Sequence, residues 1–344
     1  MRQAIIQLAP RRNLGHHPGV LLQRYLVPPD DESDKKKQEE RRNLFESAIQ
    51  AVGSDTLSAL YADAFTRWNA SFPENGLSRS RELRTTGRLI VGLGSENVLE
   101  TGLRLHHTYG VPVVPGSALK GLAAHYCGDV WGQRGSAGAG EDNRPYERRG
   151  QFHDLVFGKT DEGGMITFHD AWITPESLSQ GALRLDVMTP HHPNWQLGPD
   201  SPKFAPPTDF DSPVPVSFLS VSGAFLIHLS WNGPANTSPE LVQRWTERTM
   251  EILTEALAEW GVGGKTSSGY GRLVPVASPD TSANQTSAGS AARPAEPIHG
   301  PRQKVTVTQR TIDGKVRYEA DDGFLGSLLR GTPPAIADGE STEL

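Results

Sequence analysis

The stretch that decides the fold is SPELVQRWTERTMEILTEALAEWGVGGKTSSGYGRLVPV, residues 238–276. Ser238 is a favourable N-cap, Pro239 suits the first helical position, and apolar residues from Leu241 to Trp260 recur at the spacing of one helix face. A glycine-rich segment follows, and the alternating residues at its end predict a strand. The stretch therefore predicts a long amphipathic helix, a loop and a strand, in that order.

The glycine-rich segment, GVGGKTSSGYGRL at residues 261–273, looks like a phosphate-binding loop. Glycines allow backbone N–H groups to approach phosphate oxygens without interference from side chains. Lys265 and Arg272 add positive charge, the central hydroxyls can donate hydrogen bonds, and Tyr270 can stack on a base or a sugar. A helix C-cap followed by a tight turn explains one or two glycines but not the Lys-Thr-Ser-Ser interior. On the residues alone, a ligand loop and a plain turn both remain open.

Two enzymatic interpretations compete with backbone binding. A nucleotide-binding P-loop needs a glycine five positions before the glycine of its Gly-Lys-Ser/Thr, and Glu259 occupies that position. The helix-before-strand order is also the reverse of a P-loop. A serine acyl-enzyme stays open as an alternative, because Ser117 and Lys120 form an S-x-x-K pair whose lysine could act as the base.

Upstream segments predict more strands and another helix. Ser117 is a plausible N-cap for a helix that carries Lys120. This order of elements favours an α+β domain with a mostly antiparallel sheet and helices on one face, as in the split βαβ fold of ferredoxins and RNA-recognition domains. The strands are predicted in residues 84–95, 103–116, 164–173, 183–189 and 216–231.

Composition changes along the chain indicate four parts. Residues 1–83 hold one or two helices with a break at Gly53-Ser54, and residues 84–277 hold the α+β domain. Residues 278–304 are a low-complexity linker that is predicted to be disordered. Residues 305–344 alternate around Asp313-Gly314, the signal of a type I′ hairpin. A Gly/Arg-rich insertion is predicted at residues 133–151.

Charge and cysteine content limit the classes of protein. The net charge of −6 and pI near 6.0 argue mildly against a chain that binds nucleic acid alone, but leave room for a local basic groove or for RNA held together with partner subunits. Cys127 is the single cysteine, which excludes an intramolecular disulfide framework. Because no signal peptide or membrane-spanning run is recognised, a soluble cytoplasmic protein is expected.

Histidine pairs are the other candidate functional groups. His106 and His107 are adjacent on a predicted strand, so they point to opposite faces and cannot chelate one metal together. One of them is expected to face an RNA groove and the other the core. His191 and His192 are predicted to share a polar loop with Asp186, in a structural or RNA-contacting role.

Five segments, taken in order, resemble one family. They are LIVGLGSENVLETGLRLHHTYGVPVVPGSALKG, FG…GMITFHDAW, LRLDVMTPHHPNW, FLSVSGAFLIHL and GVGGKTSSGYGRL. Together they resemble the RAMP superfamily and, more narrowly, the family that forms the sixth subunit of the Cmr (type III-B CRISPR) RNA-guided effector complex. The resemblance runs from about Arg84 to Val274 and leaves the C-terminal tail outside it.

The resemblance implies a modified RNA-recognition (RAMP) fold whose glycine-rich loop meets the guide RNA backbone. It implies a non-catalytic subunit in antiviral defence that binds crRNA and the guide–target duplex near the 3′ end of the guide, caps the filament, and needs no cofactor. Expected partners are target RNA, a neighbouring RAMP subunit, the backbone subunit and the small helical subunit. A RAMP endoribonuclease that processes guide RNA with a histidine is the remaining alternative. The residues expected to contact RNA are Gly116, Ser117, Lys120, His106, Gly263, Gly264, Lys265, Thr266, Ser267, Ser268, Gly269, Tyr270 and Arg272.

Overall fold

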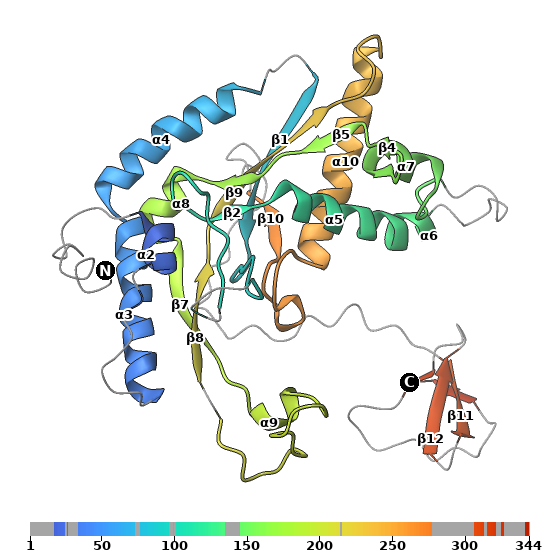
Figure 1. Ribbon diagram of the computed structural model, residues 1–344. Coiled ribbons are helices and arrows are strands. Elements are labelled where there is room, and N and C mark those ends of the chain that lie inside the picture. The colour runs from blue at the N-terminus through green and yellow to red at the C-terminus, as the bar shows by residue number, and fades with distance from the viewer. Residues whose placement is uncertain are drawn as a thin grey trace, which may run out of the picture. The chain divides into compact units, whose positions relative to one another are not determined.

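The computed structural model in Figure 1 describes most of the N-terminal 276 residues and four short strands beyond them. Contacts divide the chain into two compact units, Met1–Pro279 and Asp280–Leu344, which are described separately. The residues described are 17–24, 26, 34–72, 76–95, 99, 101–134, 145–213, 215–276, 306–312, 315–320, 325–326 and 341–343.

The first unit begins with three helices, α2 (Pro18–Arg24), α3 (Asp34–Val52) and α4 (Asp55–Ala70). The predicted break at Gly53-Ser54 is confirmed, because the Ser54 hydroxyl accepts the Leu57 N–H and starts α4 as an N-cap. None of the helices among the described residues combines the length and apolar character that a membrane span requires.

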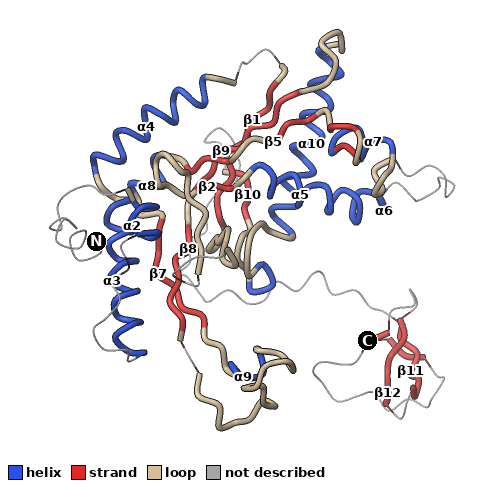
Figure 2. Tube along the Cα trace, viewed as in Figure 1, coloured by secondary structure: helices blue, strands red, loops and turns tan. Residues whose placement is uncertain are grey.

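A six-stranded antiparallel sheet forms the centre of this unit (Figure 2). Its order is β10-β1-β9-β6-β2, and β5 also pairs with β9. Helix α5 connects β1 to β5 and β6, and α10 connects β9 to β10, so two interleaved βαβ units share one sheet. The predicted α+β class with a split βαβ sheet is therefore confirmed. The bounds are β1 Ser78–Thr85, β2 Val113–Val114, α5 Gly116–Tyr126, β5 Ile166–Phe168, β6 Ala171–Ile173, β9 Ala224–Trp231, α10 Pro239–Glu259 and β10 Leu273–Pro275.

Helices pack on both faces of the sheet. Helix α10 covers the face that carries the buried Leu83, Phe225 and Ile227, and α5 packs beside it. Helix α4 covers part of the other face, where Trp68 stacks on Trp172 at 4.7 Å. The prediction of helices on one face is therefore incomplete, because the N-terminal helices bury aromatic side chains that sequence alone does not assign to the sheet.

A two-stranded ribbon, β7 (Leu183–Met188) with β8 (Val216–Val221), stands apart from the central sheet. Leu185 lies opposite Leu219, and both pack in the cluster of apolar side chains around α2 and α3. The alternate residues Phe218 and Ser220 turn the other way, as the period of a strand requires. The short helix α8 (Pro175–Ser179) precedes the ribbon. The short helix α9 (Pro193–Gln196) lies in the proline-rich segment that connects β7 to β8.

Two strands were predicted at the wrong residues. The strand predicted at residues 84–95 lies at 78–85, and the segment after it is irregular apart from a bridge between Leu89 and Val221. Residues 103–112 form only a bridge between Leu105 and Pro112. The sequence of β1 does not alternate between apolar and polar residues. The reason is that Arg79 and Arg81, on the face toward α10, are polar and donate hydrogen bonds to Glu247 and Thr254 of that helix.

Smaller elements and the second unit complete the described chain. The smaller elements are the π-helical turn η1 Cys127–Trp131, α6 Gly132–Arg134, α7 Gln151–Phe157, β3 Gly158–Lys159, β4 Glu162–Gly163 and the 3-10 turn η2 Thr266–Ser268. The second unit contains β11 Thr306–Ile312, β12 Lys315–Ala320, β13 Leu325–Gly326 and β14 Ser341–Glu343. Strands β11 and β12 pair with Ile312 opposite Lys315, which confirms the predicted hairpin. The linker at 278–304 and residues 135–144 of the insertion lie outside the described residues.

Candidate nucleic-acid interface

The glycine-rich loop is closed at its base by close backbone contacts. Gly261 reverses the chain after α10 with φ 77°, and the Val262 N–H donates to the Gly271 carbonyl over 2.9 Å. Gly271 also has a positive φ of 77°, and a Cβ on it would lie 2.0 Å from the Val262 carbonyl oxygen. Only glycine satisfies both conditions, so this position fixes the shape of the loop.

The loop rests on the irregular segment that follows β1. The Gly264 N–H donates to the Ile90 carbonyl over 2.8 Å, and the Gly271 N–H donates to the Arg88 carbonyl over 2.7 Å. Inside the loop, the Gly269 N–H donates to the Thr266 carbonyl. At these three positions the chain's own carbonyls already accept the glycine N–H groups, and contact of these glycines with RNA stays a prediction.

The open donors lie at the centre of the loop instead. Lys265 takes a left-handed conformation with φ 60°, and the 3-10 turn η2 starts after it. Within the described part of the chain, the backbone N–H groups of Lys265, Thr266 and Ser267 donate to no carbonyl. A left-handed residue followed by right-handed ones makes successive N–H groups converge, which is the geometry of an anion-binding nest. The hydroxyl-bearing Ser267 and Ser268 are exposed beside it.

Side chains of the β7–β8 ribbon hold the loop in place. The Tyr270 hydroxyl donates to the Asp186 carboxylate over 2.6 Å, and the Lys265 Nζ lies 5.9 Å from the centre of the Phe218 ring. Arg88 donates to Ser220, which in turn donates to Asp186. Tyr270 is thus anchored through its hydroxyl, and its stacking on a base stays a prediction.

This anchor is electrostatically stable at neutral pH. Burial alone would raise the pKa of Asp186, but the hydrogen bonds from Tyr270 and the Val187 N–H, together with the nearby Arg88, outweigh burial and lower that pKa. Burial first, and the bond to Asp186 second, raise the pKa of Tyr270 to about 12. Asp186 is therefore charged and Tyr270 is neutral at neutral pH.

Two arginines missed by the sequence analysis lie next to the loop. Arg84 of β1 and Arg184 of β7 line one cavity of about 240 Å³, together with Ser222. Neither guanidinium forms an ion pair among the described residues. Gly87, also in this lining, approaches the Gly269 carbonyl of the loop, so the cavity and the loop are neighbours. No sequence signal joins Arg84 to Arg184, because they lie on strands a hundred residues apart.

The start of α5 is built differently from the loop. The Gly116 N–H donates to the Asp170 carboxylate over 2.7 Å, and a Cβ on Gly116 would lie 2.0 Å from the Phe168 carbonyl oxygen. The N-cap is Pro115 rather than Ser117, because the helix begins two residues earlier than predicted. Lys120 is half-buried, Ser117 is exposed, and neither side chain forms a hydrogen bond among the described residues. A carboxylate thus stands where the sequence predicted a phosphate.

The histidines expected in the interface lie elsewhere. The His106 ring packs 4.7 Å from Trp172 and accepts the Thr108 N–H, and burial lowers its pKa. His107 is exposed, and neither residue lies in a strand. His192 bonds Asp211 over 2.8 Å, so the predicted grouping with Asp186 is wrong. Among the described residues, no three His, Cys, Asp or Glu side chains cluster as metal ligands would.

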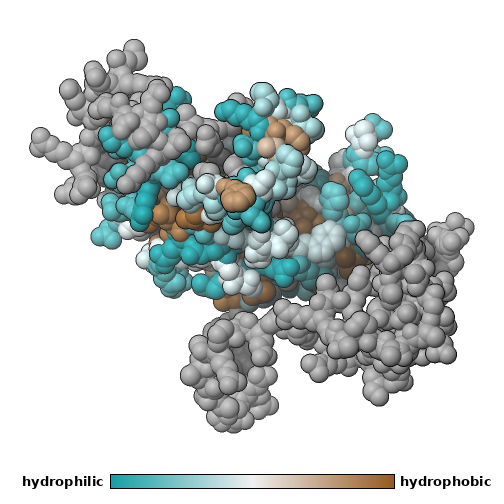
Figure 3. Space-filling view, turned by 90° about the horizontal axis from the view of Figure 1, so that it is seen from below, coloured by the Kyte–Doolittle hydropathy of each residue, from teal (hydrophilic) through white to brown (hydrophobic). Residues whose placement is uncertain are grey.

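The predicted site residues therefore separate into two groups. Residues 263–272 form one continuous loop, while His106, Gly116, Ser117 and Lys120 lie around the edge strand β2 and the start of α5. No hydrogen bond among the described residues joins the two groups. Arg272 is exposed and its carbonyl accepts the Thr86 N–H, which keeps it beside β1. The face in Figure 3 is mostly hydrophilic, with separate apolar spots.

Sequence comparisons with known proteins identify the family of the chain. A family model described as the RAMP superfamily matches residues 82–274, more than half of the chain. The CRISPR system Cmr subunit Cmr6 of Pyrococcus furiosus is 30% identical over 241 residues, which cover 56% of this chain and 66% of that protein. The chain thus spans slightly less than two thirds of that curated relative.

Two solved structures are also similar. One is the cryo-EM structure of the type III-B Cmr-beta bound to cognate target RNA, with 18% identity, a TM-score of 0.49, and coverage of 74% of this chain and 78% of that one. The other is the crystal structure of Cmr6 from Pyrococcus furiosus, with 29% identity, a TM-score of 0.36, and coverage of 58% and 98%. From the match of the family model to residues 82–274, the chain belongs to the RAMP superfamily.

Proposed function

We propose that the chain is a non-catalytic RNA-binding subunit of a type III-B CRISPR effector complex, holding crRNA and its duplex with target RNA near the 3′ end of the guide. The similarity to Cmr6 supports the type of complex. The observation that carries RNA binding is the set of three N–H groups at Lys265–Ser267, which donate to no carbonyl among the described residues and lie near arginines without an ion pair there. Backbone N–H groups and cations together are what a phosphate ester needs.

The distribution of charge explains how a chain with an acidic composition could bind RNA. Lys265 lies in the loop, Arg84 and Arg184 line the neighbouring cavity, and the nearby Arg88 offsets the negative charge of Asp186. A chain with net charge −6 can therefore present one basic face to RNA and acidic faces to proteins. Capping of the filament and contacts with the neighbouring RAMP subunit, the backbone subunit and the small helical subunit are proposed from the family resemblance alone.

The non-catalytic role is proposed over the two enzymatic alternatives. Ser117 and Lys120, the pair required by an acyl-enzyme, share no hydrogen bond among the described residues. His106 packs against Trp172 rather than beside the open donors of the loop. No observation therefore favours nucleophilic or acid–base chemistry at the residues that the sequence singled out.

The test is the salt dependence of RNA binding. In the full chain, alone and assembled with its partner subunits, Arg84→Ala with Arg184→Ala should weaken binding of single-stranded guide RNA about tenfold. It should also reduce the slope of log affinity against log salt by about 1.4, since each lost phosphate contact removes about 0.7. Arg248→Ala is the matched control, because Arg248 is an exposed arginine paired with Glu251 on α10. An unchanged slope in the double variant would contradict the proposal.

A further inference from the structure

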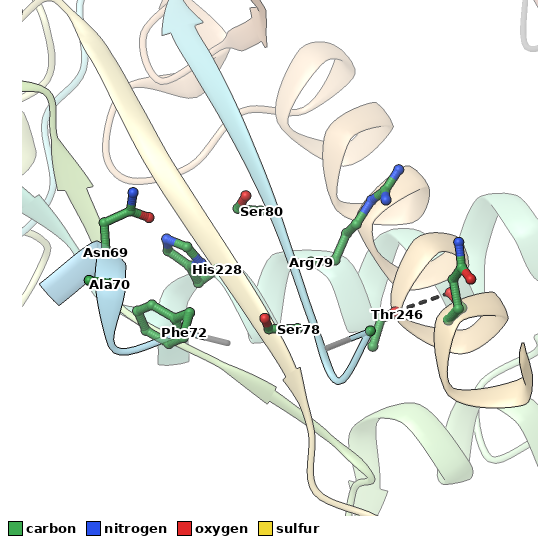
Figure 4. Close-up of a pocket in the computed structure, with 10 residues that line it drawn as sticks. Asn69, Ala70, Phe72, Ser78, Arg79, Ser80, His228 and Thr246 are labelled. Atoms are coloured by element: carbon green, nitrogen blue, oxygen red, sulfur yellow. Dashed lines mark hydrogen bonds between the residues drawn. The ribbon is translucent and has the colours of Figure 1, made fainter. Parts of the chain in front are cut away.

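A second cavity, of about 740 Å³, opens at the other end of β1 (Figure 4). Asn69 and Phe72, at the end of α4, and Ser80 and His228, on β1 and β9, line the side that faces α4. Arg79 and Gln243 line the side that faces α10. This cavity plays no part in the interface described above.

The cavity exists because β10 is shorter than β1. Strand β10 pairs only with Leu83–Thr85, and the last ladder bond runs from the Val276 N–H to the Glu82 carbonyl. Within the described part of the chain, no strand continues β10 beside the first half of β1. The sheet therefore has a notch at this edge, and α4 and α10 wall it from both faces.

His228 lies at the bottom of the notch, and its ring nitrogens form no hydrogen bond with the described residues. Its side chain is 3% exposed, and neither ring nitrogen has a partner among the described residues. Phe72 stacks on the ring at 3.9 Å, and Trp68 meets it edge-on at 4.9 Å. A buried polar group without a partner is costly, which indicates that something outside the described chain supplies one.

The charge of the cavity selects the kind of ligand. Burial lowers the pKa of His228 to about 4, so the ring is neutral and offers one donor and one acceptor. Arg79 is neutralised by Glu247 at 2.9 Å. Among its described lining residues, the cavity thus has no free cation to hold a phosphate. Its open groups are an amide, a hydroxyl and a neutral imidazole beside an aromatic ring.

We propose that this cavity binds a single unpaired nucleobase of RNA, on the side lined by Asn69, Phe72, Ser80 and His228. A base is neutral, planar and able to donate and accept at one edge, which matches the unused amide, hydroxyl and imidazole groups. The inference rests on the proposed function, since the same RNA is held by the glycine-rich loop. From Ser80 to Thr85 the strand spans about 17 Å, or roughly five stacked nucleotides.

Abasic scanning tests the proposal on the full chain. A single-stranded RNA nonamer carries one abasic nucleotide, which is moved along the strand. For the wild-type chain, one or two positions should weaken binding roughly tenfold, the effect of losing one stacked base. In Ser80→Trp, which fills the notch from an exposed position, intact RNA should bind at the abasic level and the position dependence should vanish. Thr66→Trp, at an exposed site on α4 outside the cavity, is the control and should bind every nonamer as the wild-type chain does.

A nucleoside titration separates this inference from the proposed function. Adenosine and uridine carry no phosphate, so they do not report on the glycine-rich loop. Saturable shifts of the His228 ring signals in NMR, lost in Ser80→Trp, would support the base site even if the chain does not bind the nonamer. Equal binding of every abasic nonamer, or His228 signals that stay fixed with both nucleosides, would overturn the base site while leaving backbone binding intact.

Discussion

The glycine-rich loop and the start of α5 show the same sequence signals with opposite results. Each combines glycine, serine and lysine near the end of a helix, and each suggests a phosphate site. In the loop, the N–H groups of Lys265, Thr266 and Ser267 meet no acceptor in the part of the chain that the structure describes. At α5, the Gly116 N–H is already bonded to the Asp170 carboxylate over 2.7 Å, which also adds a negative charge.

The difference lies in what the rest of the fold places opposite the backbone. At the loop, the Asp186 carboxylate accepts a hydrogen bond from Tyr270 and lies near Arg88. At α5, the turn between β5 and β6 brings Asp170 to the helix N-terminus, where a carboxylate is favoured by the helix dipole. The glycine pattern therefore indicates that another group comes close to the backbone. Tertiary contacts decide whether that group belongs to a ligand or to the protein itself.

The largest predicted effect is common to both regions. Gly271→Ala and Gly116→Ala each place a Cβ about 2.0 Å from a carbonyl oxygen, so each should lower the free energy of unfolding by about 3 kcal/mol or more. Gly121→Ala is the control, because a Cβ there meets nothing within 4 Å and sits inside α5. It should be neutral or slightly stabilising. Urea denaturation measures all three, and similar stabilities would contradict the packing described.

Acid pH should weaken the packing around His228 before it weakens the anchor of the glycine-rich loop. Burial lowers the pKa of His228 to about 4, so the unfolded chain takes up a proton below its ordinary value of 6.5 and the folded chain does not. Stability is thus complete above pH 6.5 and falls toward pH 4, by at most about 3 kcal/mol. Burial lowers the pKa of His106 and His169 in the same direction.

The loop should not respond in that pH window. The pKa of Asp186 is lowered, so its contribution is lost only at still lower pH. Urea titrations between pH 7 and 4.5 should show a falling stability for the wild-type chain and a flatter curve for His228→Phe. An identical slope for both chains would show that His228 is not the buried titrating group.

A smaller effect is expected from Asp170→Ala. Loss of the acceptor at the start of α5 leaves the Gly116 N–H without its carboxylate, which should cost about 1 kcal/mol of stability, as for other helix caps. Asp170→Asn, which keeps an acceptor oxygen, should recover part of it. RNA affinity should not fall in either variant, and a fall would place Asp170 in the RNA site rather than in the cap.

Much of the fold was predictable because local signals agree with tertiary structure. The long helix with its Ser238 cap, the strands β7, β8 and β9, and the hairpin of β11 and β12 follow the predicted segments. Strand β1 was misplaced, because only Leu83 in its sequence is a buried apolar residue. The apolar run at 89–93 was taken for that strand, but it supports the glycine-rich loop instead.

The candidate site was predictable only in its local part. The loop and Lys265 follow from sequence, because consecutive residues carry the signal. Arg84, Arg184 and the His228 notch do not, since each depends on strands that meet through the sheet order. The competing carboxylate of Asp170 was missed for the same reason: it comes from a turn 54 residues away from Gly116.

The measurement that tests the account most directly compares Lys265→Ala with Lys120→Ala. Both are half-buried lysines beside a glycine-containing turn, and each substitution removes one positive charge. For guide RNA bound to the full chain or to its assembled complex, Lys265→Ala should weaken affinity about fivefold and reduce the salt slope by about 0.7, while Lys120→Ala should change affinity less than about twofold. Equal losses for the two variants, or a larger loss for Lys120→Ala, would contradict the claim that RNA phosphate binds at the open loop.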